Sequence, residues 1–98
     1  MTVAGPLRVL MVEDVPEDAE LNVAELRRGG LDVEWRRVDT ADGLVRELEM
    51  FRPRIVLSDY SMPRFDGMAA LETCLERAPG IPFIVVTGSR NEETAVQC

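Results

Sequence analysis

The sequence contains neither lysine nor histidine, so all 11 of its basic residues are arginines. Cysteine is also scarce, because Cys74 and Cys98 are the only two, too few for the disulfide framework of a small secreted domain. No apolar run approaches the roughly 20 residues that cross a bilayer. Residues 1–7 lack the basic start and the apolar core of a signal peptide. These absences predict a cytoplasmic protein without a membrane segment.

Acidic residues outnumber basic ones by 18 to 11, which gives the 98-residue chain a formal net charge of -7. A surface of this sign argues against nucleic acid and against an anionic membrane as direct partners, and it suits cations and basic protein surfaces. The length and the 46% share of hydrophobic residues are ordinary for one globular domain with a single core. We therefore expect residues 1–98 to form one domain.

Four stretches of the sequence have the patterns of β-strands. Three are continuously apolar apart from Arg8, as is typical of central parallel strands covered on both faces. These are residues 7–12, 55–57 and 83–86. Residues 32–38 instead alternate, with Val33 and Trp35 on one side and charges between them, which predicts a half-exposed edge strand.

Helical segments separate these strands. Residues 16–28 begin with Pro16, carry acidic residues in the first turn and end in two arginines before a pair of glycines. Thr40 can cap a second helix that Pro53 stops, and a third helix is expected at residues 67–78. Its expected buried side consists of Met68, Leu71 and Leu75, and a fourth helix is expected to start at residues 91–98.

Strands and helices in this order predict an α/β fold, a doubly wound parallel sheet with right-handed crossovers and helices on both faces. Ligands of such sheets bind outside the carboxyl ends of the strands. Glu13 and Asp14 follow the first strand, Asp59 follows the third, and Thr87 follows the fourth. The three carboxyl groups are therefore expected to meet at one edge, where their mutual repulsion favours a divalent cation.

These residues, in this order and spacing, resemble the receiver domain of bacterial two-component response regulators. The resemblance rests on five short motifs: Glu13-Asp14, Asp59, Met62-Pro63, Asp66-Gly67 and Val86-Thr87-Gly88. It implies the flavodoxin-like (β/α)5 receiver fold, of which this chain would contain all but the last β/α unit. We interpret the proline and the Asp66-Gly67 turn as residues that shape the loop.

The resemblance also implies a function. Asp59 would be the phosphoacceptor, which takes a phosphoryl group from the phosphohistidine of a histidine kinase or a histidine phosphotransfer protein. Such a carboxylate is a poor nucleophile towards a charged phosphoryl group unless a cation screens it, so Mg²⁺ is expected. Asp14 would bind the ion directly and Glu13 mostly through water, while Asp59 and the carbonyl of Ser61 would complete the protein ligands.

Two further segments would sense the phosphoryl group. The hydroxyl of Thr87 would turn inward to bond a phosphoryl oxygen, and Gly88 would leave its backbone N–H accessible to the same group. Ser61 and Ser89 hold the positions that govern access of hydrolytic water, and their small hydroxyls predict no unusual shielding of the acyl phosphate. The domain would thus act as a signalling switch rather than as an enzyme.

The chain departs from the family pattern in two ways. Glu13 stands where an aspartate is usual, and the lysine expected at the end of a fifth strand is absent. We expect the chain to be a piece of a longer protein, with an output domain or a downstream protein as a further partner. An uncovered edge of the strand at residues 83–87 would invite pairing with a second copy, so a homodimer through that edge is expected.

Two other functions compete with this one. A receiver-like scaffold without phosphorylation would act as a protein-interaction module, and the missing lysine would then reflect real loss of chemistry. A doubly wound phosphohydrolase with an aspartyl nucleophile is the other alternative. That class usually needs a second aspartate two residues after the first, and here Ser61 occupies the place.

Overall fold

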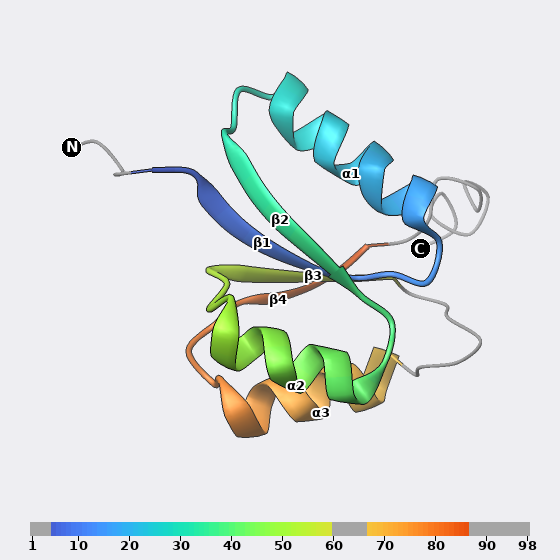
Figure 1. The fold of residues 1–98 in the computed structure, drawn as a ribbon, viewed down its shortest axis with the longest axis vertical. Helices are drawn as coiled ribbons and strands as arrows, with labels where there is room; N and C mark the ends of the chain where they lie inside the picture. Colours follow the sequence, from blue (N-terminus) through green and yellow to red (C-terminus); the bar gives the residue numbers. More distant parts are fainter. Residues whose placement is uncertain (1–4, 60–66, 87–98) are drawn as a thin grey trace.

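A computed structural model describes residues 5–59 and 67–86 of the chain. Within these residues, four parallel strands form one sheet in the order β2-β1-β3-β4. Helix α1 covers one face of the sheet, and α2 and α3 lie side by side on the other (Figure 1). The elements are β1 (Leu7–Val12), α1 (Pro16–Arg28), β2 (Val33–Val38), α2 (Ala41–Met50), β3 (Ile55–Asp59), α3 (Gly67–Arg77) and β4 (Phe83–Val86). The predicted α/β fold is confirmed.

The helices begin and end where the local chemistry of the sequence indicates. Pro16 stands in the first turn of α1, and Gly30, with a φ of 97°, turns the chain so that Leu31 N–H reaches the carbonyl oxygen of Leu26 at 3.1 Å. At the start of α2, the Thr40 hydroxyl accepts a hydrogen bond of 3.0 Å from the backbone N–H of Gly43. Both predicted helix starts are therefore correct.

The core lies on both faces of the central strand β1. Alternate residues of β1 enter two clusters, because successive side chains of a strand point to opposite faces. Leu10 and Val12 pack with buried residues of α2 and α3, and Val9 and Met11 pack against α1. A strand covered on both faces explains why residues 9–12 are all apolar and buried.

Strand β4 lies at an edge of the described sheet, and its Ile84 and Val85 are 46% and 51% exposed. Its apolar sequence is typical of a central strand, but an edge position is expected for a chain without a fifth strand. An apolar run indicates that both faces of a strand suit burial, but it does not determine how many neighbours the strand has. The helix predicted to begin at residue 91 lies outside the described residues.

The buried side of α3 differs from the prediction. Met68 and Leu75 are exposed, whereas Ala70 and Cys74 are the buried residues of this helix. The helix therefore turns its small side chains towards the sheet, which allows the closer approach that large side chains would prevent. Cys74 is 2% exposed, and burial raises the pKa of its thiol to about 11.

The described helices are short. The longest, α1, has 13 residues, and no helix within residues 5–59 and 67–86 is long and apolar enough to cross a membrane.

Candidate metal centre

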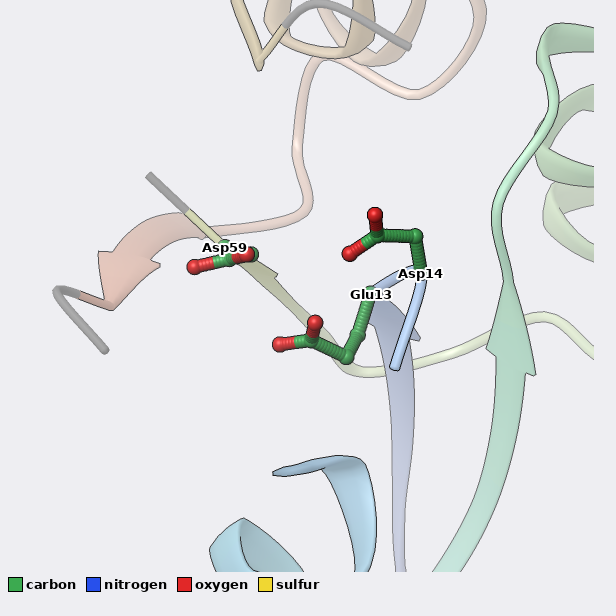
Figure 2. A group of neighbouring side chains, drawn as sticks. All are labelled: Glu13, Asp14 and Asp59. Carbon is green, nitrogen blue, oxygen red and sulfur yellow. The ribbon is translucent and has the colours of Figure 1, made fainter. Parts of the chain in front are cut away.

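Strands β1 and β3 are neighbours, and their carboxyl ends bring acidic residues together. Val12 pairs with Ser58 in the parallel register, so the next residue along each strand is an acid, Glu13 on one and Asp59 on the other. Asp14 follows at once in the turn between β1 and α1. One carboxylate oxygen from each of the three residues lies within 4.8 Å of the other two, and Figure 2 shows the three side chains around one common space.

The backbone of Glu13 is fixed by the edge strand β2. Its N–H donates to the carbonyl oxygen of Val38 at 2.9 Å, and its own carbonyl accepts a hydrogen bond of 2.9 Å from Nη1 of Arg37. The side chain is held as well, because the backbone N–H of Val15 donates to Oε2 at 3.1 Å. Contacts from β2 and from the start of α1 therefore set the position of this carboxyl group.

The electrostatics of the cluster centre on Glu13, which is only 4% exposed. Burial raises the pKa of its carboxyl to about 7, and the hydrogen bond from Val15 acts in the opposite direction. The negative charge of Asp59, a hydrogen bond with Asp14 and the charge of Asp18 raise this pKa further. Near neutral pH, Glu13 is thus divided between its protonated and ionised forms.

This arrangement fits a divalent cation with a preference for oxygen ligands. Carboxylates are the ligands that Mg²⁺ uses in proteins, and it usually takes only one or two of them beside water. Three carboxyl groups so close together repel one another when ionised, and a cation between them would relieve that repulsion. Asp14 and Asp59, which are half-buried, leave the cluster open to an ion from solvent.

The structure brings together the three acidic residues that the sequence singles out, but their roles as ligands stay a prediction. Ser61, Thr87, Gly88 and Ser89 lie outside the described residues. Sequence reasoning missed Arg37, which contacts the Glu13 carbonyl and whose Nη1 lies 3.5 Å from Oδ2 of Asp39. Charged residues alternate along an edge strand in any case, so the sequence does not indicate that Arg37 contacts the backbone of Glu13.

The comparisons with known proteins agree on a family. The sequence pattern of the response regulator receiver domain matches residues 9–98. The chain is 30% identical over 90 residues to the nitrogen assimilation regulatory protein NtrX of Azorhizobium caulinodans, covering 90% of this chain and 19% of that protein. It is 36% identical over 92 residues to the autoinducer 2 sensor kinase/phosphatase LuxQ of Vibrio cholerae, covering 90% of this chain and 10% of that protein.

Solved structures give the same result. A response regulator receiver protein from Pseudomonas putida aligns with a TM-score of 0.67 and 26% identity, over 96% of this chain and 78% of that one. The signal receiver domain of a modulated diguanylate cyclase from Desulfovibrio desulfuricans G20 aligns with a TM-score of 0.68 and 28% identity, over 93% of this chain and 72% of that one.

The parallel sheet with acidic residues at its carboxyl edge defines the class, a doubly wound α/β domain. The chain belongs to the response regulator receiver domain family. It spans about a fifth or less of the length of the two curated relatives described above.

Proposed function

We propose that this domain is a Mg²⁺-dependent phosphoacceptor in which Asp59 receives a phosphoryl group from a histidine kinase or a histidine phosphotransfer protein. The observation that supports this most is the approach of three carboxylate oxygens, from two separate segments, to within 4.8 Å of one another. Asp59 ends β3 at the edge where doubly wound sheets bind their ligands.

The proposed reaction transfers the phosphoryl group from nitrogen to oxygen. A carboxylate oxygen of Asp59 forms a bond to phosphorus, while the bond from phosphorus to the donor imidazole breaks and the imidazole nitrogen keeps the electron pair. A bound Mg²⁺ supplies positive charge that screens the phosphoryl oxygens from the attacking carboxylate. Asp14 and Asp59 would hold the ion directly, and Glu13, whose backbone is fixed by β2, would hold it mostly through water.

The proposal includes residues beyond the described part of the chain. The carbonyl of Ser61 would be a further metal ligand, and Ser61 and Gly88 would lie next to the phosphoryl group. Thr87 would bond a phosphoryl oxygen and so couple the chemistry to a change in partner binding. We infer that the domain acts in this way as a cytoplasmic switch, not as an enzyme with a separate substrate.

A titration with beryllofluoride, which mimics a phosphoryl group, tests the proposal. With Mg²⁺ present, fluorine NMR should show a bound signal that is lost in Asp59→Asn and strongly weakened in Asp14→Asn. Asp32→Asn, which changes the charge equally at an exposed position outside the cluster, is the matched control and should behave like the parent. A bound signal that persists in Asp59→Asn would refute the assignment of the phosphoacceptor.

The alternative function is a receiver-like interaction module that works without phosphorylation. In this alternative, the lysine that the family pattern places beside the phosphoryl oxygens, at the end of a fifth strand, would be missing from the whole protein. This alternative predicts no adduct at Asp59 in the same titration, even with Mg²⁺ in excess. A beryllofluoride signal that depends on Asp59 would exclude it.

We also propose that residues 1–98 form one receiver domain of a longer protein that contains an output domain or acts on a downstream protein. The apolar edge of β4, where Ile84 and Val85 are half-exposed, would pair with a second copy of the chain. Sedimentation velocity should then show a dimer for the 98-residue chain. Ile84→Asp should give a monomer, and a stable parent monomer would contradict this pairing.

A further inference from the structure

A groove of about 780 Å³ lies on the α2 face of the sheet, near the amino-terminal ends of the strands and therefore away from the carboxylate cluster. Its lining residues come from β1, from β2 and from the second half of α2 with the two residues that follow it. Four arginines line it: Arg8, Arg36, Arg46 and Arg52. We call this site the arginine groove.

The charge of the arginine groove is opposite to that of the whole chain. Four of the 11 arginines line it together with two glutamates, Glu34 and Glu47, although the chain as a whole has a formal charge of -7. Among the lining residues, one ion pair involves a glutamate: Nε of Arg36 lies 3.8 Å from Oε1 of Glu47. Positive charge is thus concentrated on this part of an acidic surface.

Two of the four guanidinium groups have no partner within residues 5–59 and 67–86. Arg46, on α2, and Arg52, just beyond it, make no side-chain hydrogen bond or ion pair with these residues. Arginine presents several N–H donors in a rigid plane that matches a carboxylate. The N–H groups of these two guanidinium groups are therefore available, and each guanidinium group can donate two parallel hydrogen bonds to one carboxylate.

The backbone at Arg52 is unusual. Its φ is 55°, in the left-handed region that glycine occupies most easily after a helix. The N–H of Arg52 donates to the carbonyl oxygen of Glu47 at 3.1 Å, and its own carbonyl accepts a 3.0 Å hydrogen bond from Nε of Arg8. This hydrogen bond links two arginines that are 44 positions apart in the sequence. Arg52 adopts a backbone conformation that glycine would adopt with less strain.

The groove also has an apolar part. The guanidinium carbon of Arg36 lies 5.2 Å from the centre of the Phe51 ring, which restricts the orientation of its plane. Met50, beside it in the lining, is 77% exposed. A ligand with both carboxylates and an apolar side chain could contact the arginines and Met50, whereas the Phe51 ring is only 8% exposed and supports Arg36.

These features favour a peptide over other anions. Glu34 and Glu47 would repel a compact polyphosphate, whereas carboxylates spaced along a chain can avoid them. In the described sheet β2 pairs only with β1, so the outer edge of β2 is available to an extended segment.

We propose that the arginine groove binds an extended acidic segment of a partner protein, with spaced carboxylates on the arginines and one apolar side chain against Met50. The interaction is separate from the carboxylate cluster. It requires neither Mg²⁺ nor phosphorylation, so its test does not depend on the function proposed above.

Fluorescence anisotropy with a labelled Gly-Asp-Glu-Leu-Asp-Glu-Gly peptide, at low ionic strength and with EDTA, tests the proposal. The parent chain should bind saturably, and Arg46→Gln and Arg52→Gly should each weaken binding, with a combined loss of at least about tenfold. Arg28→Gln, an equal charge change on the outer surface of α1, is the matched control and should change affinity less than twofold. A peptide with Asn and Gln in place of the acids should not bind.

Several results would overturn the inference. These are an absence of saturable binding, equal losses in Arg28→Gln and Arg46→Gln, or full binding of the neutral peptide. Displacement of the peptide by tripolyphosphate at a lower concentration than by unlabelled peptide would assign the groove to polyphosphates instead. Arg46 is exposed on the surface of α2, so Arg46→Gln should fold, and circular dichroism checks this.

Discussion

Glu13 directly follows β1 and Asp59 ends the neighbouring parallel strand β3, one residue beyond the paired Val12 and Ser58. The carboxyl group of Glu13 is buried beside the charge of Asp59. Burial is the main reason that the pKa of Glu13 rises to about 7, and the negative charge of Asp59 adds to the effect. The cluster in the absence of an ion therefore stores unfavourable electrostatic free energy. Protonation of Glu13, or a cation, can relieve it.

The first prediction concerns pH. In the metal-free protein the pKa of Glu13 is about 7 in the folded state, against 4.5 for an ordinary glutamate. Because the folded pKa is the higher one, the proton stabilises the folded state. This contribution is complete below pH 4.5 and is lost as the pH rises through 7. It amounts to about 3 kcal/mol at most.

Urea unfolding with EDTA at a series of pH values measures this contribution. The free energy of unfolding of the parent, minus that of Glu13→Gln, should fall between pH 4.5 and pH 7 and then level off. The subtraction removes the other titrating groups, which both proteins share. A difference that does not change over this range would show that Glu13 titrates normally.

The second prediction concerns the cation. Asp14→Asn removes one negative charge from the cluster, so it should raise the metal-free stability by about 1 kcal/mol through reduced repulsion. Mg²⁺ should raise the melting temperature of the parent, and the same substitution should abolish that increase. A purely structural role for Asp14 would instead give lower stability and an unchanged response to Mg²⁺. Differential scanning fluorimetry with and without Mg²⁺ distinguishes these outcomes.

Much of the fold could be predicted because local chemistry and global packing agree. Pro16, the acidic first turn, the terminal arginines and the glycines all indicate the same helix, and α1 has the predicted bounds Pro16–Arg28. The acids after β1 and β3 could also be found, since parallel strands with short turns bring their carboxyl ends to one edge. The approach of Asp14 to Asp59 required no knowledge of side-chain packing.

Other features could not be predicted because they depend on contacts between distant residues. The periodicity of α3 suggested that its large side chains face the sheet, but the close approach of helix and sheet selects Ala70 and Cys74. The link from Arg8 to the carbonyl of Arg52 spans 44 positions and depends on a left-handed residue. Nothing in the order of residues near Arg52 indicates that conformation, since glycine is its usual signal.

The third prediction tests the central packing. Leu10 lies in the middle of β1, has no exposed surface and contacts the cluster formed with α2 and α3. Leu10→Ala should lower the free energy of unfolding by about 2–5 kcal/mol, because it leaves a cavity that the sheet cannot close. Leu21→Ala, an identical substitution at an exposed position of α1, should change stability by less than about 0.5 kcal/mol. Equal effects in urea unfolding would contradict the assignment of the core.

The fourth prediction separates stability from binding at Arg52. Its φ of 55° is strained for arginine and easy for glycine, so Arg52→Gly should raise the free energy of unfolding by about 1 kcal/mol. The hydrogen bond from Arg8 goes to the backbone carbonyl and can persist in the variant. Arg52→Ala is the control, because it removes the guanidinium group but keeps the strain, and it should give no such gain. If both variants lose stability in urea unfolding, the Arg52 side chain supports the fold itself, and its strain has a structural cause.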